Sequence, residues 1–129
     1  MLHRLLLIIS GLFGICGIGL GAFGAHGLHD RLIASGMLSA WETAVLYHLV
    51  HTVAILAVAL VGLGQHTAAT RWLQRAGLWW AAGILLFSGS LYLMALGGPR
   101  WLGPITPVGG LAFLVGWTML LPAAAKSGR

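Results

Sequence analysis

Charged side chains are scarce in this chain, and acidic ones are nearly absent. Only 7% of the 129 residues are charged, and Asp30 and Glu42 are the only acids beside seven Lys and Arg. The mean hydropathy is +0.95. A soluble domain of this size could not hide so much apolar surface, because small domains leave a large fraction of their surface in solvent. The composition excludes a soluble domain and indicates a membrane protein.

The chain also lacks the residue patterns on which several function classes depend. Its basic residues stand singly at the ends of apolar runs, which argues against nucleic-acid binding. There are no paired carboxylates, no nucleophile–base couple and no phosphate-binding loop, so we expect a protein that is not an enzyme. Cys16 is the only cysteine, which excludes an internal disulfide. We expect it to be a small apolar packing residue.

Four apolar runs fill most of the chain, at about 5–25, 41–63, 76–96 and 105–123. Each is close to the ~20 residues that cross a hydrocarbon core. The runs lack the alternation of a membrane barrel, so we predict an all-α integral membrane protein with four transmembrane helices in one bundle, a single domain over residues 1–129. The first run resembles a secretory signal, but its length and its many glycines favour a retained span.

The basic residues predict the orientation in the membrane. With four spans both termini share one side, which carries Arg4, Arg71, Arg75, Lys126 and Arg129, whereas the other side carries only Arg31 and Arg100. Basic residues near span ends favour the cytoplasm. We therefore predict a multi-pass protein of the bacterial inner membrane with both termini cytoplasmic and the lipid bilayer as its first partner.

The connection between the first two spans has the composition of a short interfacial helix. Over residues 26–38 we expect Leu28 and Leu32 to lie on the membrane, with polar residues in the wet layer. Gly36 is expected to end this helix, since glycine is the usual residue at such a stop.

Two short patterns predict where later helices begin. Ser39 and Glu42 have the spacing of a capping box for the second span. Thr106 followed by Pro107 is typical of an N-cap with proline at the first helical position of the fourth span. Residues 64–75 are expected to form a polar loop on the inner side.

Small residues recur at helical spacings on the first and fourth spans. Such faces let helices approach closely in a membrane. The glycines that we expect to pack helices together are Gly14, Gly17, Gly21, Gly109 and Gly116. Packing within one bundle is the simpler interpretation, and an interface between subunits stays open.

Polar side chains inside the apolar runs gather in the outer half of the membrane. Polar groups are costly in hydrocarbon and usually face the bundle interior, so we predict a polar cluster or small ligand pocket there. Its candidate members are His26, Tyr47, His51, Ser88 and Tyr92. His51 follows Trp41 by ten residues, which places it roughly 15 Å deep at the rise of an α-helix.

Three interpretations of the histidines stay open. The spacings His26-x-x-His29 and His48-x-x-His51 supply imidazoles that suit zinc, copper, iron or nickel. Histidines from two copies of the chain could hold a haem. Neutral histidines that bond Tyr or Ser across helices, at about 0.6–2 kcal/mol each, are the simplest interpretation. We therefore predict no metal and no cofactor.

Motifs on all four spans connect the chain to a known family. They are GAFGAHGL at 21–28, WxTAxxYxxxH at 41–51, LFSGSLY at 86–92 and GPITPxGG at 103–110. Together they resemble the small, uncharacterised bacterial inner-membrane family typified by YgdD and YwdK. The resemblance implies four spans but no activity or ligand. It also implies that His26 and His51 belong to the shared pattern, whereas His29 and His48 do not.

The function that we predict is that of a non-enzymatic helical bundle. It would act through helix contacts, as a homo-oligomer or as an accessory or scaffold subunit of a larger membrane complex. The alternative is a binder of a metal, haem or small lipophilic ligand at the polar cluster. A proton-coupled transporter has the least support, because only one histidine lies deep and no acid is embedded.

Overall fold

The computed structural model describes residues 1–64 and 66–127, and within these residues all regular structure is helical. The elements are α1 (Leu2–Ala25), α2 (His29–Ala34), α3 (Leu38–Val61), α4 (Ala68–Gly83), a π-helix (Ile84–Ser88), α5 (Gly89–Ala95), a 3₁₀ turn (Arg100–Leu102), α6 (Ile105–Thr118) and α7 (Leu120–Ala125).

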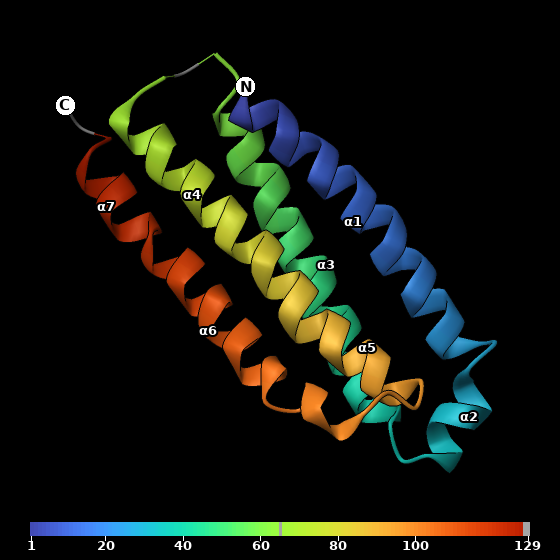
Figure 1. The fold of residues 1–129 in the computed structure, drawn as a ribbon. Coiled ribbons are helices and arrows are strands. Elements are labelled where there is room, and N and C mark those ends of the chain that lie inside the picture. The colour runs from blue at the N-terminus through green and yellow to red at the C-terminus, as the bar shows by residue number, and fades with distance from the viewer. Residues whose placement is uncertain (65, 128–129) are drawn as a thin grey trace.

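Four helical segments are long and apolar enough to cross a membrane. They are Leu2–Ala25, Leu38–Val61, Ala68–Ala95 and Arg100–Ala125. The third joins α4, the π-helix and α5, and the fourth joins the 3₁₀ turn, α6 and α7. The four lie alongside one another as a bundle (Figure 1). The predicted all-α membrane fold with four spans is confirmed.

The second and third spans form the centre of the bundle, and α1 and α6 flank them (Figure 1). Helix α1 packs mainly on α3 and touches α4, whereas α6 packs on α4 and the π-helix. Side chains therefore meet in two interiors, which one apolar cluster joins from Leu6 of α1 to Phe113 of α6. One is enclosed by α1, α3 and the third span, and the other by α3, α6 and the third span.

The third span begins earlier than the sequence predicts. Residues 68–75 belong to α4, so the predicted loop over 64–75 is wrong for them. Thr67 explains the difference. Its hydroxyl oxygen accepts from the backbone N–H of Thr70, and the hydroxyl oxygen of Thr70 accepts from the backbone N–H of Thr67. This capping box starts the helix before the apolar run does. The exposed Arg71 and Arg75 therefore stand on its first two turns.

The two other predicted helix starts are wrong. Helix α3 begins at Leu38 without a side-chain cap, and Ser39 lies inside its first turn. Gly36, with φ of +69°, turns the chain directly into α3. Helix α6 begins at Ile105, so Thr106 is helical, and its hydroxyl lies 2.7 Å from Ser90 Oγ. At α6 this tertiary contact thus takes the place of the predicted cap.

The short helix between the first two spans exists as α2, and Gly36 follows it as predicted. Leu32 does not lie on the membrane, however, because it is fully buried against Trp41 and Tyr92. The guanidinium of Arg31 donates to the carbonyl of Leu96 at 3.0 Å. These contacts fold α2 against the end of the bundle.

Cys16 is not the packing residue that the sequence predicts. Its side chain is exposed on α1. A thiol is apolar enough to face lipid, so burial in the protein is not required.

Candidate functional site

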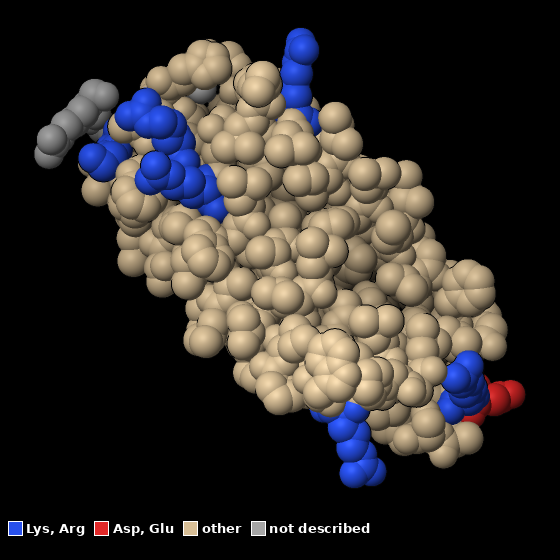
Figure 2. Space-filling view, viewed as in Figure 1, with Lys and Arg blue, Asp and Glu red and all other residues tan. Residues whose placement is uncertain are grey.

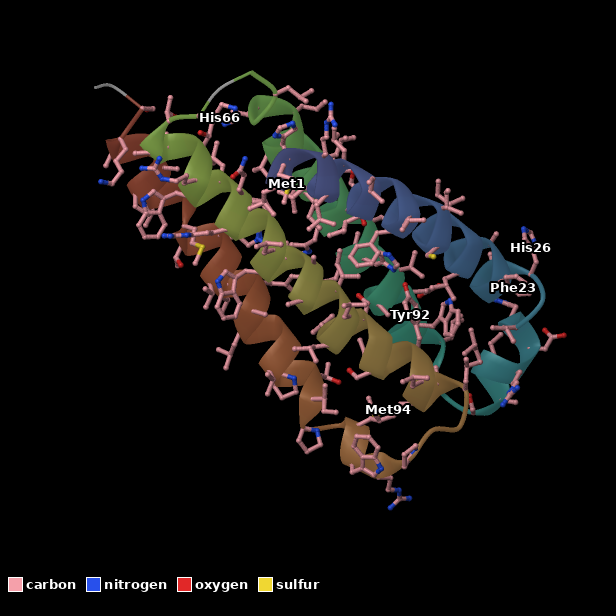
Figure 3. All side chains as sticks on the ribbon, turned by 45° about the horizontal axis from the view of Figure 1, so that its top comes forward. Met1, Phe23, His26, His66, Tyr92 and Met94 are labelled. Atoms are coloured by element: carbon pink, nitrogen blue, oxygen red, sulfur yellow. The ribbon has the colours of Figure 1, made fainter. Side chains whose placement is uncertain are left out.

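The five candidate residues do not form one cluster. His26 is exposed at the end of α1 and points away from the bundle, whereas Tyr92 points between the helices (Figure 3). The other four divide between the two interiors. Tyr47 and His51 lie on the side of α6, and Ser88 and Tyr92 lie where α3 meets the third span.

His51 is held by two hydrogen bonds and one stacked ring. Its Nδ1 lies 2.8 Å from the carbonyl oxygen of Tyr47, and the indole N–H of Trp117 donates to its Nε2 at 3.0 Å. Phe113 stacks on the imidazole at 3.7 Å between ring centroids, with 15° between the planes. His51 therefore connects α3 to α6 at mid-depth in the membrane.

These partners define the chemical state of His51. A carbonyl only accepts, so Nδ1 must donate; the indole only donates, so Nε2 must accept. The arrangement fits the neutral imidazole with its proton on Nδ1, and both nitrogens are in use. A metal or haem iron needs a free imidazole lone pair, so it would have to displace Trp117.

No metal-binding group of three residues is present in the part of the chain that the structure describes. His, Cys, Asp and Glu side chains nowhere come together there in threes. The four histidines considered for a metal are instead dispersed: His26 is exposed, while His48 and His51 make separate contacts. The geometry therefore favours hydrogen-bonding roles for the buried pair.

An open groove lies beside His51, between α3 and α6. It has a volume of about 540 Å³, and its walls are mostly aromatic: Tyr47, His51, Phe87, Phe113 and Trp117, with Pro107, Gly110, Leu111 and Leu114. The ring of Tyr47 packs 4.7 Å from that of Phe87 and stays 41% exposed. The predicted site residues Tyr47 and His51 thus border an open space here, and the groove suits a flat apolar molecule.

The other interior contains His48, which the sequence motifs left aside. Its Nδ1 lies 3.2 Å from the hydroxyl of Tyr92, and Phe13 meets the imidazole edge-on. Its Nε2 is buried and has no hydrogen-bond partner among the described residues. Tyr92 thus pairs with His48 and not with His51, so it does not join Tyr47 and His51 in one cluster.

Ser88 ends the π-helix and makes a bond between spans. Its hydroxyl is fully buried and donates to the carbonyl oxygen of Ala44 at 2.8 Å. A π-helix adds one residue to a turn and often marks a functional region. Here it directs Phe87 to the groove beside His51 and Ser88 to α3.

All five predicted packing glycines lie at contacts between helices of the same chain. A Cβ on Gly17 or Gly21 would approach Leu49 or Val45 of α3, and one on Gly14 would touch Thr52. On the fourth span, a Cβ on Gly109 would overlap the backbone of Phe87, and one on Gly116 would overlap the indole of Trp80.

Sequence reasoning missed His48, Phe113 and Trp117 as members of these two interiors. Trp117 and His51 are 66 residues apart, and Tyr92 and His48 are 44 apart, so no local spacing relates them. The sequence did contain one signal for these contacts. His and Trp each need a hydrogen-bond partner when they are buried in a membrane, so each could have been expected to bond another side chain or the backbone.

Comparison with known proteins agrees with the motifs. The family model described as "Protein of unknown function (DUF423)" matches residues 20–110. The UPF0382 membrane protein YwdK of Bacillus subtilis (strain 168) is 42% identical over 128 residues, which cover 95% of this chain and 98% of the relative. The chain belongs to this family.

Similar proteins also occur in Haemophilus influenzae and Escherichia coli. The UPF0382 inner membrane protein YgdD of Escherichia coli (strain K12) is 38% identical over 130 residues, which cover all of this chain and 95% of the relative. No solved structure matches the chain. The family resemblance predicted from the motifs is confirmed, and the chain is a multi-pass membrane protein of a family whose function is uncharacterised.

Proposed function

We propose that this member of the DUF423 family is a non-enzymatic protein of the bacterial inner membrane that acts through helix contacts, as a homo-oligomer or an accessory subunit. The observation that carries the proposal is the division of the glycines on α1. Gly17, Gly21 and Gly24 face α3, whereas a Cβ on Gly11 or Gly19 would meet no atom within 4 Å. Small residues on an outward face let another helix approach closely.

The polar side chains of the interior support this proposal in a second way. His51, Ser88 and Ser90 each bond another span, through Trp117, Ala44 and Thr106. Intramembrane hydrogen bonds of this kind stabilise a bundle by about 0.6–1.7 kcal/mol each. The interior is thus engaged in holding the spans together, and the outward face of α1 is where a partner helix would bind.

Cys16 provides a direct test, because it is exposed on α1 and is the only cysteine. Mild oxidation in native membranes should cross-link two copies of the chain if α1 pairs with itself, and Cys16→Ser should abolish the product. A different membrane protein that co-purifies and is lost in Gly11→Leu/Gly19→Leu would support the accessory role. A monomer by native mass spectrometry in several lipids, with no co-purifying partner, would refute both.

The proposed orientation places both termini in the cytoplasm. Arg4 lies near the start of α1, Arg71 and Arg75 near the start of α4, and Lys126 directly after α7, at the end of the bundle that carries the termini (Figure 1). Arg31 on α2 and Arg100 on the 3₁₀ turn lie at the opposite end (Figure 1). Figure 2 shows Lys and Arg side chains at both ends. Arg129, counted in the prediction, lies outside the described residues. Positive charge favours the cytoplasmic side. A fluorescent protein fused to the C-terminus should be bright and an alkaline phosphatase fusion inactive; the reverse would invert the topology.

A second candidate function is the binding of a small lipophilic ligand in the groove between α3 and α6. The observation that favours it is the open, aromatic-lined volume of about 540 Å³ beside Tyr47 and His51. Lipid extracts of the purified wild type should then contain a molecule that is lost from Leu111→Trp, which would fill the groove from its exposed edge. Identical extracts from the two proteins would reject this candidate.

A further inference from the structure

A second groove, on another side of the bundle, runs between α1 and α3. It has a volume of about 500 Å³. Its α1 wall is made of Gly21, Gly24 and Ala25, which have little or no side chain, and Val45, Leu46 and Leu49 are among the residues of its α3 wall. The small residues let the two helices approach closely and leave a shallow apolar channel along their junction.

The channel has one polar end. Glu42 of α3 and His29 at the start of α2 line it there. Glu42 is exposed and is one of only two acids in the chain. The Nδ1 of His29 is buried and finds no hydrogen-bond partner among the described residues. A carboxylate and an unsatisfied imidazole nitrogen thus stand where an otherwise apolar channel reaches the membrane surface.

The length of the channel corresponds to one leaflet. Its α3 wall runs from Leu38 to Val50, which are twelve steps of the α-helix apart, or roughly 18 Å. Half of a hydrocarbon core is about 15 Å. An occupant would therefore extend from the headgroup layer to near the midplane, as one acyl chain of a phospholipid does.

We propose that this groove binds an aminophospholipid from the leaflet opposite the termini. One acyl chain lies along Gly21, Ala25 and Leu49, and the primary ammonium donates to the carboxylate of Glu42. The imidazole of His29 turns on binding, so that its buried Nδ1 reaches the groove and donates to a phosphate oxygen. Charge complementarity selects this occupant, because a carboxylate next to a nitrogen donor matches a zwitterion with a terminal ammonium. An anionic headgroup would place like charge beside Glu42.

The proposal is independent of the oligomeric state proposed above, since this groove lies on the α3 side of α1 and not on its outward face. A hydrophobic helix from a partner could also fit an apolar groove, but its binding would not depend on the carboxylate of Glu42. The experiments below distinguish a bound lipid from a bound helix.

Native mass spectrometry of the full chain, purified with phosphatidylethanolamine and phosphatidylglycerol of identical acyl chains, tests the headgroup. We expect wild type to retain phosphatidylethanolamine in preference to phosphatidylglycerol. In Glu42→Gln the ratio of the two retained lipids should fall about fivefold, which corresponds to the loss of one interfacial ion pair. Asp30→Asn is the matched control, because Asp30 does not line the groove, and it should leave the preference unchanged. Equal loss in both variants, or no preference in wild type, would overturn the proposal.

Two further arms test the donor and the channel. Phosphatidylcholine has no N–H on its headgroup and should be retained less than phosphatidylethanolamine; equal retention would refute the bond to Glu42. Ala25→Phe fills the channel and should abolish lipid retention, whereas Ala22→Phe, exposed on α1 outside the groove, should not. Retention that persists in a folded Ala25→Phe would overturn the site, and a bound protein in place of lipid would assign the groove to a partner helix.

Discussion

The two outer helices, α1 and α6, are attached to the same central pair in different ways. Helix α6 buries four of its 14 residues, Gly109, Ala112, Phe113 and Gly116, and Trp117 and Thr106 bond the central spans. Helix α1 buries only four of 24 residues, Leu6, Ser10, Gly17 and Gly24. Among the described residues, one side-chain hydrogen bond joins it to the centre, from Trp41 Nε1–H to the carbonyl of Leu20 at 2.9 Å.

The two outer helices show that different contacts can attach a span to the same membrane bundle. Without a hydrophobic force between helices, close packing and polar bonds decide which spans associate. Helix α6 has both, including rings that interlock with His51, whereas α1 relies on glycine contacts along one narrow face. We infer that α6 is a fixed part of the core and that α1 is the more separable span.

Gly109→Ala should have the largest effect. A Cβ there would overlap the backbone of Phe87 in the π-helix, which cannot move aside as a side chain could. We expect the free energy of unfolding in bicelles to fall by about 2–3 kcal/mol. Gly110→Ala is the control on the same helix, since its Cβ would meet Phe87 at an ordinary 3.9 Å. Equal effects would show that α6 does not pack on this backbone.

Gly24→Ala should have a smaller effect, on α1. Its Cβ would overlap the indole of Trp41 and break the bond to Leu20, but a side chain can yield. We expect a loss of about 1–2 kcal/mol in the same unfolding assay. Gly11→Ala, which meets nothing within 4 Å, should be neutral within error. A loss at Gly24 larger than at Gly109 would reverse the comparison of the two helices.

Trp117→Phe should cost about 1 kcal/mol, because it leaves Nε2 of His51 without its donor. The nitrogen chemical shift of Nε2 of His51 should change because it loses its donor, whereas Nδ1 should keep its proton because it still donates to the carbonyl of Tyr47. Trp79→Phe is the control, since Trp79 is exposed on α4. An unchanged Nε2 shift in Trp117→Phe would refute the assignment of this bond.

Ser90→Ala should have the smallest effect, about 0.6 kcal/mol. The hydroxyl of Ser90 donates to the carbonyl of Phe87 at 2.9 Å and lies 2.7 Å from Thr106 Oγ1. Among the described residues, the contact with Thr106 is the one side-chain hydrogen bond between the third span and the start of α6. A double-mutant cycle with Thr106→Val isolates the pair term. A coupling energy of zero would mean that packing alone attaches the start of α6.

Local patterns predicted much of the fold and less of the site. The apolar runs were predictable because length and composition alone decide what crosses a bilayer. The predicted helix starts at Ser39 and Thr106 are wrong for one reason. A side chain that can cap a helix was assumed to cap the nearest helix end, but Ser39 does not cap α3 and Thr106 bonds the distant Ser90. Thr67, the true cap, stands before residues too polar to count as a span.

The candidate site shows the same limit more sharply. His48 and His51 are three residues apart, so on a helical projection they differ by about 60°. Only the positions of α1 and α6 decide that His48 faces Phe13 and Tyr92 while His51 faces Phe113 and Trp117. The π-helix was equally hidden, because its extra residue changes the directions of Phe87 and Ser88 without a sequence signal.

The sequence by itself thus determined the solvent, the number of spans and the glycines that face inward, because hydropathy and small-residue spacing are local properties of each helix. The tertiary structure decided which polar groups meet, which grooves stay open and which glycines of α1 remain uncovered. These depend on how helices distant in the chain are placed around α3, and a difference of one residue in a turn is enough to move a side chain from one interior to the other.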